Sequence, residues 1–302
     1  MHGVEPHGGK DSLDDMNRYA IYTAVVGGYD NIYQPCVVDD RFDYYLFSND
    51  IQEERVGVWN IRNIPYHHND PTRVARWVKT HPEQLLPDYA CSVWMDCNIQ
   101  IADGYIYSRA VQACGNGELV ASVQHLGRNC IYDEAAAVLA DHFDHEKVVL
   151  HWVKQLKKRG YPRNNGLFET NILFRVHNNT KIEAIDKAWW ECINQYSKRD
   201  QLSFNYLLWR FGIHADFVLQ PPEVAGCSPH VNYYKHASGK SFEITKDEDP
   251  FFYYFRLTGG NETFETQYSI YSRIISHRNP YKFALAWGRY RLVRWKVLNG
   301  FK

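Results

Sequence analysis

The chain has 302 residues, a formal net charge of −1 at pH 7, and 45% hydrophobic and 23% charged residues. These proportions are typical of a soluble globular protein, and the length allows one or two domains. A charge so close to zero argues against a general nucleic-acid-binding protein, which carries a strong basic excess. No apolar run reaches the roughly 18 residues of a membrane span, and the N-terminus lacks a signal-peptide core, so we expect a cytoplasmic protein.

The cysteines are scattered along the chain without the close pairs of a zinc site. They are Cys36, Cys91, Cys97, Cys114, Cys130, Cys192 and Cys227. We therefore expect reduced thiols, as in cytosolic proteins. Aromatic residues are numerous, with 22 Tyr, 15 Phe and 9 Trp. This composition suits a surface for flat or sugar-like ligands, and a tyrosine-rich core explains it equally well.

Residues 1–17 are polar and unpatterned, which predicts a mobile tail. The β-prone run over residues 19–26 predicts a strand buried on both faces of a parallel sheet. Gly27 and Gly28 follow at its carboxyl end, where open α/β sheets bind ligands and where glycine lets the backbone approach closely. A tight turn without a ligand is the alternative.

The next predicted elements are two strands and a helix, over residues 43–48, 58–64 and 70–86. The helix begins with an Asp-Pro-Thr cap and bends at His81-Pro82. Along it, Arg73, Arg76 and Lys79 recur every three residues and share one face. Such a stripe can bind a diphosphate, since Arg offers a planar fork and Lys a point charge. A solvated surface face is the alternative.

An apolar run over residues 92–95 leads into Asp96, and Asn98 follows two positions later. Ile99 and Ile101 then resume an alternating pattern, as in a strand that leaves a sheet and re-enters it. Oxygen ligands at the carboxyl end of a strand can hold Mg²⁺, which proteins bind through one or two carboxylates plus substrate phosphates. An ordinary turn is the alternative, because Asx residues favour turns.

The second half continues to alternate strands and helices, which predicts an α/β fold with a mostly parallel sheet. Helices are predicted over residues 105–114, 133–159, 180–196 and 204–211, and strands over 118–123, 167–176 and 214–219. Glu169 and Asn171 are polar residues inside one of these strands. Buried polar groups must be hydrogen-bonded, so the two are either structural anchors or site residues.

The end of the chain is basic, because no Asp or Glu follows Glu265. Over residues 271–302, Lys and Arg alternate with aromatic and aliphatic residues, which is typical of a helix lying at a membrane surface. A helix packed back on the domain with its basic face in water is the alternative. We therefore divide the chain into a tail (1–17), a main domain (18–265) and a basic amphipathic C-terminal segment (266–302).

Several segments together resemble a glycosyltransferase-like family that was first defined only as a domain of unknown function. Its plant members are implicated in pollen-tube turgor and seed mucilage. The matching segments occur in family order at residues 22–30, 73–82, 87–101, 128–134, 165–171 and 199–205. Together they span roughly residues 19 to 220.

The resemblance implies a GT-A-like fold, with a Rossmann-like sheet flanked by helices that binds a nucleotide-sugar. It also implies Mn²⁺ or Mg²⁺ at an Asp-x-Asp motif, which here reads Asp96-Cys-Asn98. A histidine is expected to complete the metal site, and His214, His230 and His236 are the candidates, of which we select His236.

The same resemblance assigns the donor site and the catalytic groups. The residues expected to bind the nucleotide-sugar are Thr23, Ala24, Gly27, Gly28, Arg73, Arg76, Lys79, Asp96 and Asn171. Asp200 and Glu169 are the candidates for a carboxylate that stabilises the oxocarbenium-like transition state or acts as a base. Asp200-Gln201 resembles the Asp-Gln motif of certain retaining GT-A enzymes. A strand anchor and a helix cap are the structural alternatives for the two carboxylates.

These patterns lead to the hypothesis of a glycosyltransferase that moves a sugar from a nucleoside-diphosphate-sugar to a hydroxyl of a glycan or glycolipid acceptor. The enzyme is expected in the cytoplasm, with the inner membrane face as an alternative site of attachment. The rival functions are a non-catalytic carbohydrate-binding module of the same fold and a sugar nucleotidyltransferase, because one fold supports several chemistries.

Replacing Asp96 by Ala is expected to abolish sugar transfer while leaving the fold intact, because the change removes the carboxylate that would serve donor and metal. Nucleoside diphosphate release and circular dichroism measure the two effects. Asp88→Ala, in the turn before the same strand, is the control. Full activity of the Asp96 variant would contradict the metal-site hypothesis.

Overall fold

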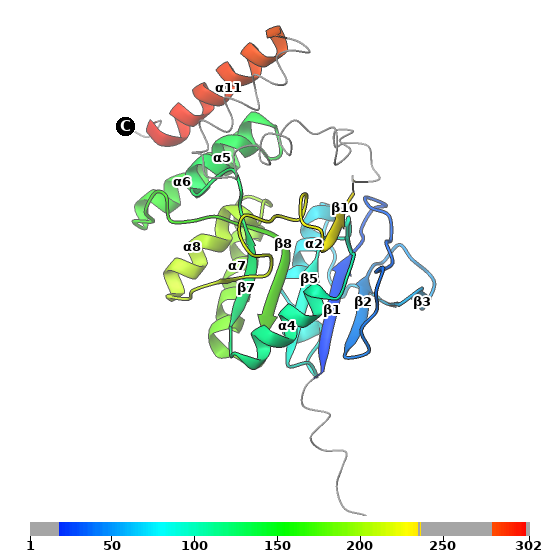
Figure 1. Cartoon of the computed structure of the whole chain (residues 1–302). Helices are drawn as coiled ribbons and strands as arrows, with labels where there is room; N and C mark the ends of the chain where they lie inside the picture. The colour runs from blue at the N-terminus through cyan, green and yellow to red at the C-terminus, as the bar shows by residue number, and fades with distance from the viewer. Residues whose placement is uncertain (1–17, 235, 237–279, 300–302) are drawn as a thin grey trace, which may run out of the picture.

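The computed structural model describes residues 18–234, 236 and 280–299. The predicted tail over residues 1–17 and much of the C-terminal segment lie outside these residues. A large sheet forms the centre of the described part, with strand order β3-β4-β2-β1-β5-β8-β7-β9 (Figure 1). Its strands are β1 (Tyr19–Ala24), β2 (Phe42–Phe47), β3 (Arg55–Val56), β4 (Trp59–Arg62), β5 (Cys91–Met95), β7 (Val120–Gln124), β8 (Phe168–Val176) and β9 (Asp216–Phe217).

The sheet is mostly parallel, as the sequence predicts. Strand β1 pairs in parallel with β2 and β5, and β2–β4 and β7–β9 are also parallel. Strand β8 lies between β5 and β7 and runs antiparallel to both. The reversal of β8 places its first residues beside the carboxyl end of β5, where the Asp96 N–H donates to the Asn171 carbonyl over 2.8 Å. The polar residues of β8 therefore lie at the ligand-binding edge of the sheet.

Helices cover both faces of the sheet, because successive strand residues point to opposite sides. Tyr22 and Trp94 belong to a buried cluster that includes side chains of α2, α5, α6, α7 and α8. Ile21 and Val93 belong to a second buried cluster with α4. The helices are α2 (Pro71–Lys79), α3 (Pro82–Leu85), α4 (Tyr105–Gly115), α5 (Ile131–Ala140), α6 (Glu146–Lys158), α7 (Thr180–Gln195), α8 (Gln201–Phe211) and α11 (Pro280–Asn299). The result is a three-layer α/β/α domain.

The predicted helix over residues 70–86 is two helices, α2 and α3, separated where the bend at His81-Pro82 was expected. Asp70 caps α2, because its carboxylate accepts the Thr72 N–H over 3.0 Å. Helix α2 ends at Lys79, whose backbone carbonyl accepts the Tyr22 hydroxyl over 3.1 Å. This contact fixes the C-terminal turn of α2 against β1.

The residues after Asp96 depart from the prediction, because they do not re-enter the large sheet. Strand β6 (Ile99–Ile101) instead pairs with β10 (Val231–Tyr233) in a separate antiparallel pair. The turn at residues 96–98 takes the chain away from the large sheet, and Ile99 and Ile101 are buried in the same cluster as α4. The predicted strand over residues 214–219 is also shorter than expected, since only β9 pairs with β7.

The prediction of reduced thiols is wrong for one pair of cysteines. Cys91 on β5 and Cys114 on α4 form a disulfide, with 6.7 Å between their Cα atoms. The packing of α4 against the sheet brings together two residues that are 23 positions apart. Sequence spacing alone could not indicate this contact. Disulfides persist mainly in oxidising environments, so the cytoplasmic location stays a prediction.

Helix α11 packs against α5 (Figure 1). Tyr290 and Val297 are buried, and the Arg294 guanidinium donates to Asp133 of α5 over 2.9 Å. The packed-back alternative for this helix is therefore the one that the structure shows. Leu292 and Trp295 nevertheless remain more than half exposed. Within the described residues, no helix is long and apolar enough to cross a membrane.

Candidate active site

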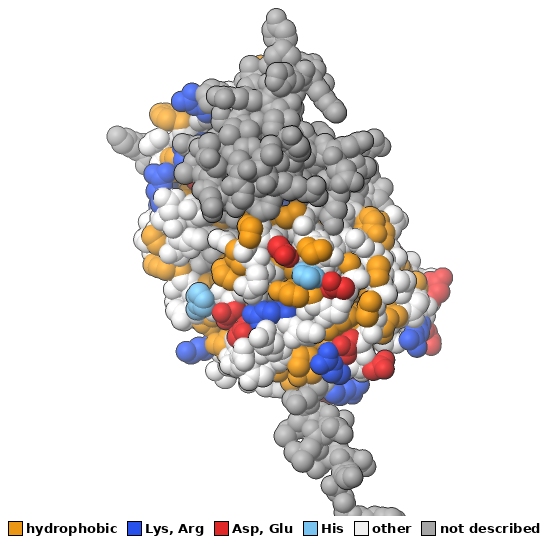
Figure 2. All heavy atoms as spheres, viewed as in Figure 1, with side chains coloured by type: hydrophobic (Ala, Val, Ile, Leu, Met, Phe, Trp, Pro, Cys, Tyr) orange, Lys and Arg blue, Asp and Glu red, His pale blue; other side chains and the backbone are white. Residues whose placement is uncertain are grey.

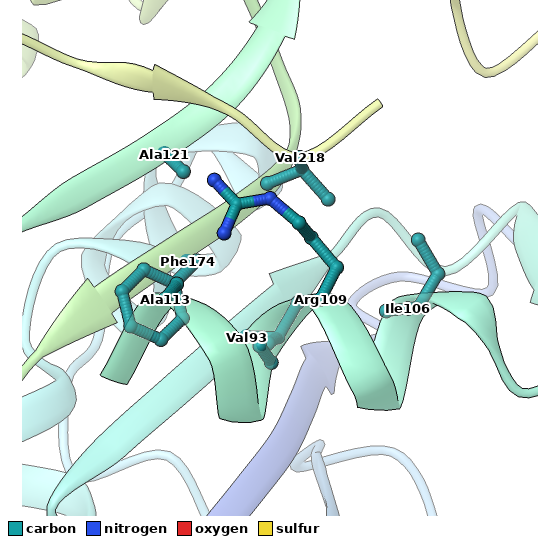
Figure 3. A pocket seen from close by; sticks show the side chains of 8 residues that line it. Val93, Ile106, Arg109, Ala113, Ala121, Phe174 and Val218 are labelled. Atoms are coloured by element: carbon teal, nitrogen blue, oxygen red, sulfur yellow. The ribbon is translucent and has the colours of Figure 1, made fainter. Parts of the chain in front are cut away.

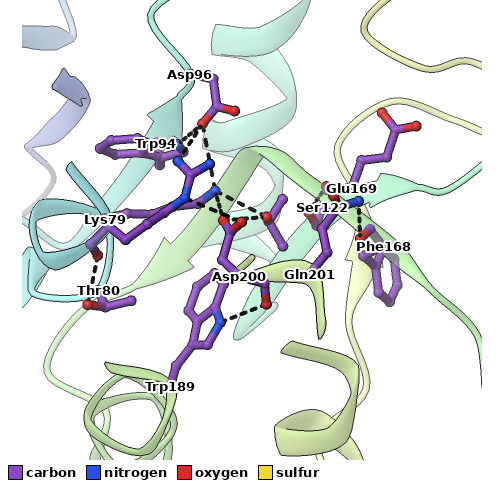
Figure 4. Close-up of polar contacts among 12 residues, drawn as sticks. Lys79, Thr80, Trp94, Asp96, Ser122, Phe168, Glu169, Trp189, Asp200 and Gln201 are labelled. Carbon is purple, nitrogen blue, oxygen red and sulfur yellow. Dashed lines mark hydrogen bonds and ion pairs between the residues drawn. The ribbon is translucent and has the colours of Figure 1, made fainter. Parts of the chain in front are cut away.

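Four charged side chains from three elements meet at the carboxyl ends of β1 and β5. Lys79 is fully buried, and its Nζ lies 2.5 Å from Asp200 Oδ2 and 3.7 Å from Asp96 Oδ1. Arg76 approaches the same two carboxylates, with Nε 3.3 Å from Asp200 and Nη1 3.6 Å from Asp96. Figure 4 shows Asp200 and Asp96 on either side of the Lys79 amine. We call these four residues the charged quartet.

Within the charged quartet, burial and the attraction between opposite charges shift the pKa values in opposite directions. Burial raises the pKa of Asp200, but Arg76 and Lys79 outweigh it and hold that pKa well below the ordinary range. Burial also lowers the pKa of Lys79, against the attraction of Asp200 and Asp96. Asp200 therefore stays ionised at neutral pH and cannot accept a proton there. Asp200 fixes two cations, and its predicted role as an ionised carboxylate that stabilises an oxocarbenium-like transition state stays a prediction.

Asp96 presents one carboxylate oxygen to the protein and the other away from it. Its Oδ1 accepts the Trp94 indole N–H over 2.7 Å and faces the quartet cations. Figure 4 shows the second oxygen pointing away from Trp94 and Lys79. The side chain is 25% exposed. This outer oxygen is therefore open to a ligand.

Glu169 lies on β8 and points to the same side of the site as Asp96 (Figure 4). Its carboxylate accepts the Asn171 amide N–H over 3.1 Å. Burial raises the pKa of Glu169 to about 7, despite the opposing effect of Asn171. The Asn171 Oδ1 is buried and has no hydrogen-bond partner among the residues that the structure describes. Glu169 can thus exchange a proton at neutral pH, and Asn171 has an unused acceptor beside it.

Asp200 and Gln201 begin α8, but neither caps it with its side chain. Asp200 instead accepts the Thr170 hydroxyl over 2.8 Å, so the carboxylate is held between α8 and β8. The Gln201 amide donates to the Phe168 carbonyl at 3.4 Å. The helix-cap alternative for Asp200 therefore does not describe its side chain.

The turn after β1 has the geometry that its glycines allow. Gly27 and Gly28 have φ values of +69° and +60°, which side-chain-bearing residues rarely adopt. The Gly27 N–H donates to Asp50 over 2.6 Å, and both glycines are exposed. Thr23 and Ala24 are buried in β1. The nucleotide contacts predicted for these four residues stay predictions.

Arg73 differs from its two neighbours on the predicted stripe. Its guanidinium donates to the carbonyls of Ile193 and Tyr196, near the end of α7. Arg73 therefore ties α2 to α7, while Arg76 and Lys79 belong to the quartet. Its contact with a diphosphate stays a prediction.

The three candidate histidines lie in different places. His214 is 84% exposed, and His230 pairs with Asp103 over 2.8 Å. His236 Nδ1 pairs with Asp30 Oδ1 over 2.7 Å. Burial lowers the pKa of Arg76, and Asp30 is among the carboxylates that raise it. Metal-binding histidines typically donate their second ring nitrogen to a carboxylate, which is the arrangement of His236.

The ligand chemistry of Asp96 and His236 suits a divalent cation, whose binding here stays a prediction. The Asn98 amide nitrogen donates to the Tyr234 carbonyl over 2.8 Å. Within the described residues, no group of three or more His, Cys, Asp or Glu side chains could hold a metal. Further ligands would have to come from a substrate, as Mg²⁺ sites often use phosphates.

Two residues near these groups were missed by the sequence analysis. Tyr233 is 47% exposed as a residue, and burial of its hydroxyl raises its pKa, against hydrogen bonding to Asn98 and with a further increase from Glu169 and Asp96. Arg199 directly precedes Asp200 in a segment that carried the family resemblance, so its position was a usable signal. Tyr233 lies beyond the last predicted strand, where no pattern marked it.

A small apolar pocket under α4 is separate from this site. Its lining is shown in Figure 3 and consists of Val93, Ile106, Arg109, Ala110, Ala113, Ala121, Phe174 and Val218. Arg109 is its one polar lining residue, and its guanidinium is held by Glu118 and the Phe217 carbonyl. This lining therefore offers no acid or base. On the face seen in Figure 2, acidic, basic and hydrophobic side chains of the described residues are interspersed.

Asp200→Asn is expected to destabilise the protein by about 3–5 kcal/mol, because it leaves two buried cations without their main counter-charge. Urea unfolding at pH 7 measures this loss. The pKa of Asp200 is lowered in the folded protein, so its ion pairs contribute fully to the free energy of unfolding when the pH is above the ordinary pKa of 3.8. This contribution is lost as the pH falls below that value.

Asp70→Asn is the matched control for this variant. Asp70 pairs with Lys198 over 3.0 Å in a partly exposed position, and Asn keeps the helix cap. Its cost should stay below about 1 kcal/mol. Equal losses in the two variants would contradict the stabilising role of the quartet.

Comparison with known proteins gives the chain a family. The profile described as TOD1/MUCI70, glycosyltransferase-like domain, matches residues 10–223, which is more than half of the chain. A search of curated proteins found no match.

Three solved structures show a distant likeness. WbbM, a bifunctional glycosyltransferase in its apo form, has a TM-score of 0.39 and 10% identity, over 71% of this chain and 40% of that chain. Mouse xyloside xylosyltransferase 1 has a TM-score of 0.38 and 7% identity, over 67% of this chain and 84% of that chain. GlyE from Streptococcus pneumoniae TIGR4 has a TM-score of 0.37 and 11% identity, over 87% of this chain and 64% of that chain. The family assignment rests on the profile, and this chain belongs to the TOD1/MUCI70 glycosyltransferase-like family.

Proposed function

We propose that the protein transfers a sugar from a nucleoside-diphosphate-sugar to a hydroxyl of a glycan or glycolipid acceptor. The observation that carries this proposal is the position of Glu169. This carboxyl group has a pKa of about 7 and points to the same side as the outer oxygen of Asp96. An inverting transfer needs a proton acceptor for the acceptor hydroxyl, and Glu169 supports this proposal because it can take that role beside Asp96.

The donor would bind at the carboxyl ends of β1 and β5. The exposed Gly27-Gly28 turn would border the nucleotide, as such turns do in open α/β sheets. Arg76 and Lys79 would hold Asp96 in place at this edge of the sheet. Asp96 and His236 would hold Mn²⁺ or Mg²⁺, which supplies Lewis-acid neutralisation of the leaving diphosphate when bound.

In the proposed reaction, the acceptor oxygen forms a bond to the anomeric carbon as the bond from that carbon to the diphosphate oxygen breaks. The acceptor hydroxyl proton passes to the Glu169 carboxylate, and the nucleoside diphosphate leaves with the bonding electrons. The Asn171 Oδ1, which has no partner in the described part of the chain, can accept a hydrogen bond from a sugar hydroxyl. Asp200 takes no proton, because its pKa lies far below neutrality.

The location of the enzyme follows from the acceptor in this proposal. A glycolipid acceptor would place the protein at the cytoplasmic face of a membrane. Leu292 and Trp295 on the outer side of α11 would then touch the bilayer surface. A soluble glycan acceptor requires no such contact.

Glu169→Gln is expected to lower the rate of sugar transfer by about 10²–10⁴-fold, because the amide keeps the shape but cannot accept the proton. Donor affinity should change little. The rate of nucleoside diphosphate release and the donor dissociation constant give the two values.

In the wild type, kcat/KM should fall as the pH drops below about 7, because the carboxylate becomes protonated. Glu83→Gln is the matched control, since the pKa of Glu83 is also raised to about 7 by burial and this residue lies on α3. If Glu169→Gln transfers sugar at the wild-type rate, Glu169 is not the base. The same conclusion follows if Glu83→Gln abolishes the dependence of kcat/KM on pH near 7.

A further inference from the structure

Arg199 is a cation beside the charged quartet that forms no ion pair among the described residues, although its charge acts against burial to lower the pKa values of Glu134, Asp141 and Asp200. Within the described residues, its guanidinium forms no hydrogen bond or ion pair, and its Nε is buried without a partner. The guanidinium lies over the ring of Phe143, with 5.1 Å between the Cζ atom and the ring centroid. The backbone of Arg199 is fixed, because its N–H donates to Ser197 and its carbonyl accepts from Leu202.

The surroundings of Arg199 place it at the proposed reaction site. It directly precedes Asp200, and its field acts on both the Asp200 carboxylate and the Tyr233 hydroxyl. Burial has the largest effect on the pKa of Tyr233 and raises it, Glu169 and Asp96 raise it further, and Arg199 lowers it. Because Arg199 directly precedes Asp200, it lies beside the charged quartet.

The other described cations around this site are already matched by carboxylates. Arg76 and Lys79 face Asp96 and Asp200, so the charged quartet has no net charge. Next to the quartet on the β7 side, Arg128 is paired with Glu134. Among the described residues, Arg199 has carboxylates in its neighbourhood but no ion pair, so its guanidinium can bind a negatively charged substrate group.

We propose that Arg199 binds an oxyanion of the substrate, through the planar fork of its guanidinium. A buried guanidinium nitrogen without a partner is costly, and phosphate and carboxylate oxygens are the acceptors that match its geometry best. Two sources can supply such an oxyanion, the diphosphate of the donor and the carboxylate of an acidic sugar. This inference rests on the proposed function only in naming the complete substrate to which the oxyanion belongs.

Binding of small anions tests the proposal without any turnover. Inorganic pyrophosphate and glucuronate serve as probes of the two sources, and isothermal titration gives their dissociation constants for the wild-type protein and for Arg199→Met. Loss of the charged hydrogen bonds should weaken binding of one probe by about 10-fold to 100-fold. Weaker pyrophosphate binding identifies the donor diphosphate, and weaker glucuronate binding identifies an acidic sugar.

Arg210→Met is the matched control, because Arg210 lies on the adjoining helix α8 and its guanidinium packs over Phe211 in the same manner. It should leave both dissociation constants unchanged. The proposal is overturned if Arg199→Met binds both probes as the wild type does, or if the wild type binds neither. If the wild-type protein transfers sugar but Arg199→Met binds both anions as tightly as the wild type, the proposed function holds and the role of Arg199 is refuted.

Discussion

The ion pairs of Lys79 are the constraint on which the site depends. A fully buried ammonium requires compensation, and the Asp200 carboxylate at 2.5 Å supplies it. This pair connects the end of α2 to the beginning of α8, and Arg76 adds a second link between the same helix and both carboxylates. The quartet consequently holds Asp96 at the carboxyl end of β5 with one oxygen facing inward and one outward. Fixed charges of this kind need no rearrangement when a substrate binds.

The reversed direction of β8 is the second requirement. Because β8 runs antiparallel to β5, its first residues lie at the edge where β5 ends, and Glu169 reaches the same side as Asp96. Two carboxylates in one site then behave differently. Asp200 is held ionised by two cations, whereas burial brings the pKa of Glu169 to about 7. Different surroundings thus give one group an electrostatic role and make the other available for proton transfer.

Sequence patterns predicted local features best. The cap at Asp70 and the break before Pro82 depend on neighbouring residues, and both are confirmed. Contacts across the fold left no such pattern. Arg73 and Arg76 are three residues apart and were predicted to share one face of the helix. Tertiary packing nevertheless places the Arg73 guanidinium at the end of α7. Likewise, nothing local indicated that the chain after Asp96 would pair with β10 or that Cys91 would meet a cysteine of α4.

The central claim is that this site consumes a nucleoside-diphosphate-sugar. Its most direct test is to incubate the purified protein with a panel of such donors and Mn²⁺ and to measure nucleoside diphosphate formation. The account predicts that at least one donor yields nucleoside diphosphate, with a rate that rises as the pH passes through about 7. A protein that neither binds nor consumes any donor in the panel would contradict it. Release of pyrophosphate from a nucleoside triphosphate and a sugar phosphate would contradict it equally.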